Sequence, residues 1–319
     1  VRVTAQLIEA ATGKQVWAES YDRQLQDILA VQDEISRKIA TELGVKLSWG
    51  ELFRYKALST DNYQALDFYQ QADVHFTRLE KGGNLRAREL LEKALALDPD
   101  FSRAIAFLGW THLLEVMYGW SKDPARSLAL AEELAQRAIA VDDRVYLGHT
   151  LQAGIHGVKG NFEQAIAAGE RAVEASPNHV IAIQSLANNL TFAGRAEEAV
   201  VLYRKALRLS PYPPSYIRGN AGRAHYFTGN HEEAAKTFRD YLALQKQGAK
   251  ARLMRLYLIA SYMELGREDD AREVVEDLLE LKPDFTVGAA VKLFKRRPFK
   301  DHSFVKRMSE QWRQAGLPE

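Results

Sequence analysis

The chain of 319 residues contains no cysteine. This absence excludes disulfide scaffolds, cysteine-ligated zinc, iron–sulfur clusters and thiol nucleophiles. The sequence also lacks an apolar run of the roughly 18 to 20 residues that a membrane helix requires. Neither sign of charge is in excess, because 43 Lys and Arg balance 42 Asp and Glu. The chain as a whole is therefore not attracted to nucleic acid or to an anionic membrane. We therefore expect a soluble cytoplasmic protein.

Signatures of catalysis are equally scarce. The sequence contains no H-E-x-x-H, no phosphate-binding G-x-x-x-x-G-K-[ST] and no calcium-loop spacing. Two of the eight histidines, His156 and His225, occupy the same position of a repeat, which favours packing between helices over metal ligation. We expect no catalytic residue, no metal site and no cofactor in this chain.

A repeat organises most of the sequence. Counting from Gly194, small or apolar residues follow at Ala199, Tyr203 and Ala206, and a proline follows at Pro211. The same frame begins at Gly82, Gly160 and Gly266, and less regular copies begin at Gly229 and near Ala131. The glycines 160, 194, 229 and 266 are separated by 34, 35 and 37 residues, and we count about six units in all.

This spacing predicts pairs of antiparallel helices. The glycine would lie in the turn, the following small or apolar residues would mark one face of the second helix, and the proline would end the unit. The pattern resembles the tetratricopeptide repeat family over roughly residues 61–284. The resemblance implies an all-α helix-turn-helix solenoid whose first helices line a groove for peptides or proteins.

The first residues follow a different pattern. Val1 to Leu7 alternate in polarity, Thr12 to Lys14 supply a turn, and Val16 to Tyr21 predict a second strand. A helix is expected from Asp27 through Leu43. The segments VTAQLIEAATGKQVWAESYDR and ILAVQDEISRKIA resemble the C-terminal part of a TolB-like α/β domain. Because the chain begins at Val1 inside a predicted strand, we expect it to be a piece of a longer polypeptide.

The last residues predict a terminal helix. Phe304, Met308 and Trp312 recur on one face behind Asp301, as in the capping helix that covers the end of a solenoid. We divide the chain into a partial TolB-like domain over residues 1–50, a solenoid over 51–290, and a basic segment with the capping helix over 291–319. A basic patch lies in the last part: Lys292, Lys295, Arg296, Arg297 and Lys300. A solvated face explains it better than a nucleic-acid site, since no nucleic-acid motif surrounds it.

The spacing from the glycines also predicts which residues line the groove. The expected partner-binding residues are Trp110, Gln184, Asn188, Thr191, Arg223, Tyr226 and Met263. Asn188 and Arg223 could hydrogen-bond a peptide backbone or a carboxylate. We expect a protein or peptide partner in this groove, or self-association through it, and neither a membrane nor a nucleic acid as partner.

The tail RRPFKDHSFVKRM with QAGLPE resembles cyclase-associated proteins of TolB-like and tetratricopeptide architecture. The resemblances imply a non-catalytic interaction and regulatory region of a bacterial signalling protein, whose class III adenylate or guanylate cyclase domain would lie upstream. Three alternatives remain open: the regulatory region of a winged-helix transcription regulator, a free-standing scaffold, and an enzyme with an unrecognised site in the groove.

Overall fold

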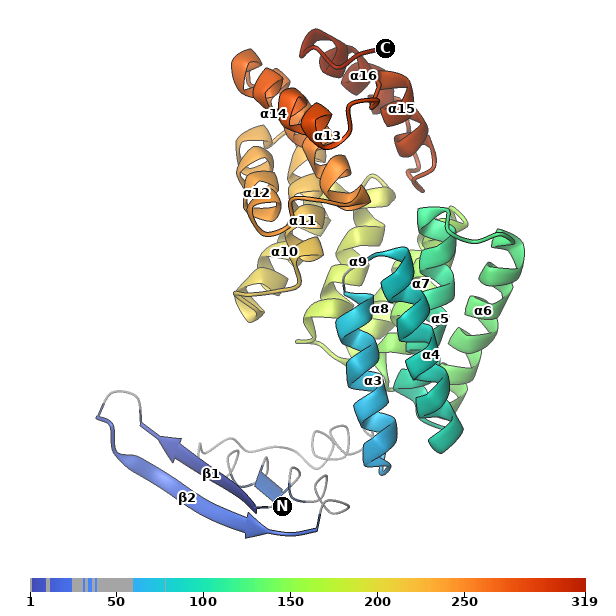
Figure 1. Cartoon of the computed structure of the whole chain (residues 1–319), viewed down its shortest axis with the longest axis vertical. Coiled ribbons are helices and arrows are strands. Elements are labelled where there is room, and N and C mark those ends of the chain that lie inside the picture. The colour runs from blue at the N-terminus through green and yellow to red at the C-terminus, as the bar shows by residue number, and fades with distance from the viewer. Residues whose placement is uncertain are drawn as a thin grey trace.

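The computed structural model describes residues 2–9, 12–24, 31, 34, 35, 38, 60–77 and 79–319. Over these residues the chain forms one β-hairpin and fourteen α-helices of 9 to 18 residues (Figure 1). The helices pair in sequence order, so the predicted all-α solenoid is confirmed.

The first helices of the pairs are α3 (Tyr63–Phe76), α5 (Ser102–Tyr118), α7 (Tyr146–Val158), α9 (Val180–Phe192), α11 (Ser215–Phe227), α13 (Ala249–Glu264) and α15 (Val287–Lys295). Their partners are α4 (Lys81–Leu97), α6 (Pro124–Val141), α8 (Phe162–Ala175), α10 (Ala196–Leu209), α12 (His231–Leu244), α14 (Glu268–Leu281) and α16 (Phe304–Gln314). Six pairs are repeat units, and α15 with α16 covers the last of them. Helix α15 crosses residue 291, where the sequence suggested a boundary.

Four of the predicted turn glycines adopt the left-handed conformation that the geometry requires, whereas the prediction for Gly82 is wrong because this residue lies in the first turn of α4. Their φ angles are 75° at Gly160, 84° at Gly194, 77° at Gly229 and 69° at Gly266. In each turn the N–H after the glycine donates to a carbonyl five residues earlier, as from Arg195 to the oxygen of Leu190 at 2.9 Å. A side chain with a Cβ is disfavoured at this φ, which explains why glycine occurs in these four turns.

The core lies between the two helices of each unit and between successive units. The alanines five residues after the turn glycines, Ala165, Ala199, Ala234 and Ala271, all have 0% exposure. Small residues at this contact let the paired helices approach closely, while larger side chains such as Phe238 fill the space beside them.

The amino-terminal residues form the predicted hairpin. Strand β1 (Arg2–Ile8) pairs antiparallel with β2 (Gln15–Asp22), with Leu7 opposite Trp17. Of the helix expected over residues 27–43, only positions 31, 34, 35 and 38 are described, and these are helical; the rest lies outside the described residues. The assignment of this part to a TolB-like domain stays a prediction.

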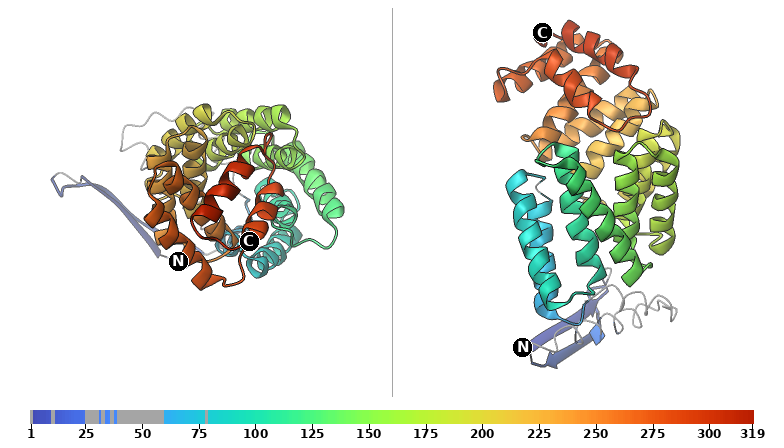
Figure 2. Two further views of the ribbon diagram at one scale, coloured as in Figure 1. Left: turned by 90° about the horizontal axis from the view of Figure 1, so that it is seen from above. Right: turned by 90° about the vertical axis from the view of Figure 1, so that its right-hand side faces the viewer.

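The carboxyl-terminal pair closes the solenoid. Helix α16 buries Val305, Met308 and Trp312, and the Trp312 indole N–H donates to the carbonyl of Leu256 at 2.9 Å. The predicted capping helix is therefore present. Asp301 lies before it, where its carboxylate accepts from the backbone N–H of Ser303 at 2.7 Å. Seen from above, the repeats form a ring, and α15 and α16 lie across its end (Figure 2).

The crossing segment, residues 296–303, joins α15 to α16 and reaches back to earlier repeats. The Lys300 N–H donates to the carbonyl of Phe192 in α9 at 3.0 Å. The Phe299 ring packs 4.8 Å from Phe192 and 5.3 Å from Phe227, measured between ring centroids. Contacts between residues far apart in the sequence thus hold the superhelix closed.

Within the described part of the chain, none of the helices has the length and apolarity needed to span a bilayer.

Replacing Gly222 by alanine should destabilise the fold. A Cβ at this position in α11 would lie 2.7 Å from the ring of the fully buried Phe238, which has no room to move. Overpacking of this kind costs about 1 to 3 kcal/mol. We expect a lower urea midpoint for Gly222→Ala by circular dichroism. Gly82→Ala in α4 is the matched control, because nothing lies within 4 Å of its Cβ, and it should be neutral or slightly stabilising. Equal midpoints for the two variants would contradict this account of the helix contact.

Candidate functional site

The inner face of the solenoid encloses a cavity of about 540 Å³. Its walls come mainly from the first helices α3, α5, α7, α9 and α11, with Lys250 of α13 and Pro298 of the crossing segment. This volume lies in the range typical of sites for small organic ligands or for a few residues of a peptide.

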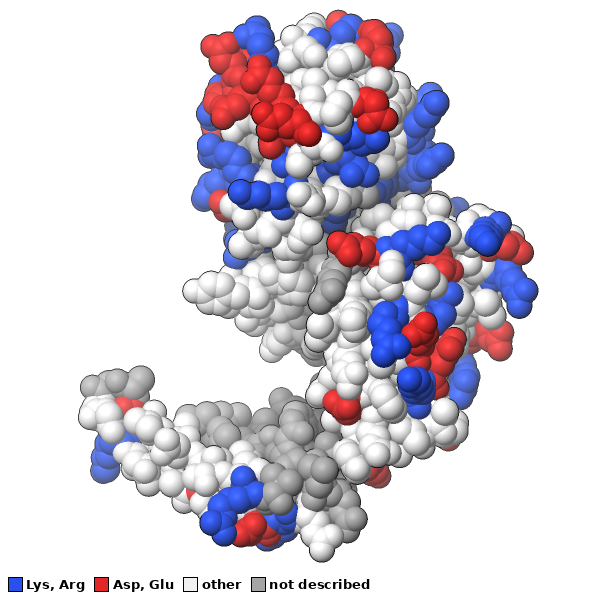
Figure 3. All heavy atoms as spheres, in the orientation of Figure 1, with Lys and Arg blue, Asp and Glu red and all other residues white. Residues whose placement is uncertain are grey.

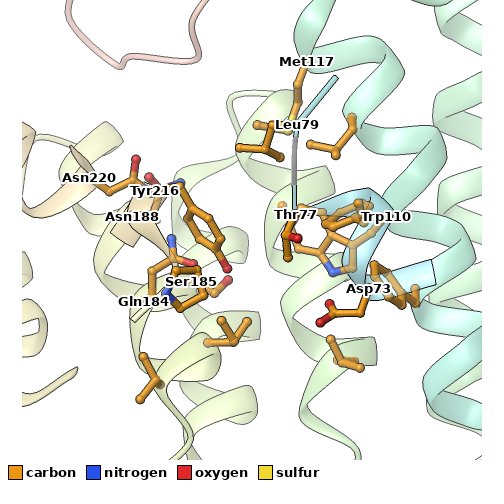
Figure 4. A pocket seen from close by; sticks show the side chains of 18 of the residues that line it. Asp73, Thr77, Leu79, Trp110, Met117, Gln184, Ser185, Asn188, Tyr216 and Asn220 are labelled. Atoms are coloured by element: carbon orange, nitrogen blue, oxygen red, sulfur yellow. The ribbon is translucent and has the colours of Figure 1, made fainter. Parts of the chain in front are cut away.

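Two walls face each other across the cavity. Asp73, Thr77 and Trp110 project from α3 and α5, and Gln184, Asn188 and Tyr216 project from α9 and α11 on the opposite side (Figure 4). Helices distant in sequence face one another because the repeats curve into a ring. The cavity is therefore a product of the closed superhelix and is not contained in any single repeat.

Aromatic rings form much of the lining. They come from five first helices: Tyr69, Phe76, Phe107, Trp110, Tyr118, Tyr146, Phe192 and Tyr216. Several rings pack against one another, as Tyr69 does with Phe107 at a centroid distance of 5.4 Å. Rings held in this way give a preformed surface for apolar or flat groups.

The described lining contains one acidic side chain, Asp73, and two basic side chains, Arg103 and Lys250. Asp73 is open to the solvent of the cavity, yet enclosure by the walls raises the pKa of its carboxyl, and the charge of Arg103 partly opposes this. The Arg103 guanidinium lies 5.1 Å from the ring centroid of Tyr69. Burial lowers the pKa of Lys250 well below the usual value, and the neighbouring cations Arg223 and Arg297 lower it further.

Three of the seven residues predicted for the groove line the cavity: Trp110, Gln184 and Asn188. Arg223 lies directly behind this wall, 3% exposed, where it donates to the Asn188 side-chain oxygen and covers the Phe192 ring at 4.5 Å. The predicted neighbours Asn188 and Arg223 are thus brought together, with Arg223 acting on the cavity through Asn188.

The other three predicted residues do not border the cavity. Thr191 is buried, and its hydroxyl donates to the carbonyl of Ala187 in its own helix at 2.8 Å. Tyr226 is buried against Tyr257, and Met263 packs on the same core. Spacing from a glycine locates a residue along a helix, whereas the twist between successive repeats decides which way it faces, so these three residues lie outside the cavity lining.

The sequence missed several polar groups of the lining, among them Asp73, Arg103, Tyr216 and Lys250. Tyr216 and Lys250 lie in the first turn of their helices, further from the repeat glycine than the positions used for prediction. Tyr146 and Val180 occupy the same first turn in other units. Comparing the first turns of the units could therefore have identified Tyr216 and Lys250 from the sequence.

The structure divides the predicted basic patch. Lys292, Lys295, Arg296 and Lys300 are exposed, but the Arg297 guanidinium turns inward and lies 5.6 Å from the ring centroid of Tyr118. Phe294 and Phe299 are buried, so these rings are not available to stack on bases. Both signs of charge are interspersed over the visible outer surface, with acids gathered over α14 (Figure 3).

The histidines belong to helix packing. His112, 13% exposed in its side chain, lies near Arg88 and Glu115, and burial lowers its pKa to about 4. Burial also lowers the pKa of His156 and His225. In the described ranges, three or more His, Asp or Glu side chains are nowhere grouped so that they could hold a metal ion.

His179 should make stability depend on pH. Its ring stacks on Tyr146 at 3.8 Å and its Nδ1 accepts from the Ile181 N–H at 3.3 Å, a role that needs the neutral form. Burial, aided by Arg103, lowers its pKa from 6.5 to about 4. The unfolded chain therefore binds more protons between these values, and the free energy of unfolding should fall as the pH drops from about 6.5 to 4.

The variant His179→Asn keeps a capping acceptor but removes this titration. We expect the decrease in unfolding free energy over that pH range to be smaller by about 1 to 2 kcal/mol, after allowance for partial exposure. Urea titrations at several pH values measure it. Parallel curves for the two proteins would show that His179 does not titrate as its environment indicates.

Comparison with known proteins agrees with this architecture. Residues 121–180 and 220–284 match the family described as tetratricopeptide repeat. Over 152 residues the chain is 37% identical to "Putative adenylate cyclase 3" of Rhizobium meliloti (strain 1021), a stretch covering 47% of this chain and 25% of that protein. The matched stretch thus represents about a quarter of the relative's length.

Solved structures of similar shape include the protein described in "Functional Characterization of Pseudomonas Aeruginosa pilF", 20% identical with a TM-score of 0.48, covering 73% of this chain and 95% of that one. Another is YrrB, "a TPR protein with an unusual peptide-binding site", 15% identical with a TM-score of 0.43, covering 64% of this chain and 97% of that one. The family match and the repeated helix-glycine-helix geometry agree that the chain contains tetratricopeptide repeats over residues 121–180 and 220–284.

Proposed function

We propose that this chain is the non-catalytic, cytoplasmic interaction and regulatory region of a larger bacterial signalling protein, a nucleotide cyclase. Its role would be to bind a protein or peptide segment in the groove, or a second copy of itself, and so alter how the catalytic domains associate. The cyclase centre would lie outside this chain, upstream of a TolB-like segment.

The observation that carries the interaction role is the cavity on the inner face of the repeats. Its lining combines aromatic rings with the amides Gln70, Gln184 and Asn188. Rings offer apolar contact area and amides offer both donors and acceptors, which is the chemistry that an extended peptide needs. The first helices supply these groups from rigid elements, so little order has to be gained on binding.

The link to cyclic-nucleotide signalling is supported by the relative named as an adenylate cyclase. The identity of 37% extends over about half of this chain, and most of that relative lies outside the match. A regulatory region joined to a catalytic domain would give this arrangement. The sequence resemblances at both ends of the chain point the same way.

The parent reading frame tests the proposal directly. We expect a class III cyclase domain upstream of Val1, cyclic nucleotide formation from ATP or GTP by the parent protein with Mg²⁺ or Mn²⁺, and none by the purified chain alone. Sequencing upstream and a cyclic-nucleotide assay measure these. A winged-helix domain in that place would assign the chain to a transcription regulator, and turnover by the chain alone would contradict the non-catalytic role.

Photocrosslinking tests whether the groove is the partner site. Gln70 is exposed and lines the cavity, whereas Glu197 is exposed on the second helix α10. With p-benzoylphenylalanine at either position of the parent protein in the native cell, we expect crosslinks to a protein or a second copy from position 70 and few from position 197. Equal yields would place the partner elsewhere on the solenoid.

A further inference from the structure

Three cations gather where α11, α13 and the crossing segment meet, and they lack acidic partners. Among the described residues, Arg223, Lys250 and Arg297 take part in none of the salt bridges, although ion pairs are frequent elsewhere in the chain. Arg223 and Arg297 both lower the pKa of Lys250, and Arg223 also lowers that of Arg297. Enclosed positive charge without a counter-ion is costly, which makes this region favourable for an anion.

Neutral groups hold these cations in place. Arg223 donates to the side-chain oxygen of Asn188, and the Lys250 ammonium donates to the side-chain oxygen of Asn220 at 3.1 Å and to the carbonyl of Tyr216 at 3.4 Å. These two contacts use two of the three ammonium protons of Lys250, and the ammonium also lies 5.1 Å from the centroid of the Tyr216 ring.

The contacts also fix the orientation of two amides. Arginine and lysine only donate, so the oxygens of Asn188 and Asn220 must face Arg223 and Lys250. The amide N–H groups then point the other way, and both asparagines line the cavity on the wall shown in Figure 4. Lys250 belongs to the same lining, so this wall presents donors and positive charge together.

The opposite wall is suited to a flat apolar group. The Trp110 side chain projects toward the cavity across from Tyr216 (Figure 4), and Phe107 and Tyr69 continue the aromatic surface. Of the described charged side chains on this side, Asp73 and Arg103 have opposite signs and interact with each other, so they partly cancel. The surplus charge of the lining is thus on the side of Lys250.

We propose that the cavity binds a small organic anion with an aromatic body, whose carboxylate or phosphate oxygens accept from Lys250, Asn188 and Asn220 and whose ring lies against Trp110 and Tyr216. Such a ligand goes beyond the proposed partner binding. It does not depend on a cyclase domain upstream, and it would give a regulatory region a chemical input. The cavity volume of about 540 Å³ accommodates a molecule of this size.

Three probes of similar size distinguish the chemistry: phenylacetate, phenyl phosphate, and the uncharged phenylacetamide. Calorimetric titration of the full chain with each, up to about 10 mM, measures affinities in the range expected for such small ligands. We expect at least one anion to bind about tenfold or more tightly than the amide, because the contacts are charge-assisted. The better of the two anions identifies the natural headgroup.

Two variants test the assignment of the donors. Lys250→Met should reduce anion affinity to the level of the amide. Asn188→Asp should also reduce anion affinity to the level of the amide, because it replaces an amide donor by a negative charge. The same change gives Arg223 an acidic partner, so we expect the thermal midpoint to stay the same or rise. An unchanged or higher midpoint would show that the loss of binding is not caused by unfolding. Lys292→Met, an exposed change on α15, is the control and should bind as the unchanged chain does.

The proposal is overturned by any of three results. These are no binding of either anion, equal binding of anion and amide, and anion binding that survives both Lys250→Met and Asn188→Asp. None of these results affects the sequencing upstream of Val1, the cyclic-nucleotide assay or the crosslinking experiment. Failure of this inference and failure of the proposed function can therefore be told apart.

Discussion

The close contact between the two helices of each unit is the constraint on which the rest of the structure depends. It requires a small residue five positions after a left-handed glycine, and Ala199 and Ala234 meet this requirement with no exposed surface. Because the same contact recurs in every clear unit, the repeats stack with a constant twist. The twist carries the first helices round a ring, and the cavity follows from that ring.

The ring of repeats is closed by a second set of contacts, which does not recur from unit to unit. The crossing segment, within the last pair, packs Phe299 against both Phe192 and Phe227, while Arg297 reaches the ring of Tyr118. None of these contacts is part of the repeat pattern. They join the end of the solenoid to its middle, and they turn an open groove into an enclosed site with an aromatic lining.

Enclosure also sets the electrostatics of the site. Arg223 and Lys250 would be ordinary solvated cations on an open surface, but the closed ring surrounds them with amides and rings in place of water or carboxylates. Their charge then orients Asn188 and Asn220. The polar character of the cavity thus depends on side chains behind its wall as much as on those that border it.

The sequence alone determined the six repeat pairs, the hairpin and the capping helix, because turn glycines, small residues and apolar spacing are local properties; it did not predict helix α15. It also brought Asn188 and Arg223 together, since they occupy equivalent places in neighbouring units. Only the tertiary structure decided that Thr191 and Tyr226 turn into the core and that Asp73, Lys250 and Tyr216 share one cavity. The physical reason is that these positions depend on the accumulated twist of several repeats and on contacts of the crossing segment, which no single repeat encodes.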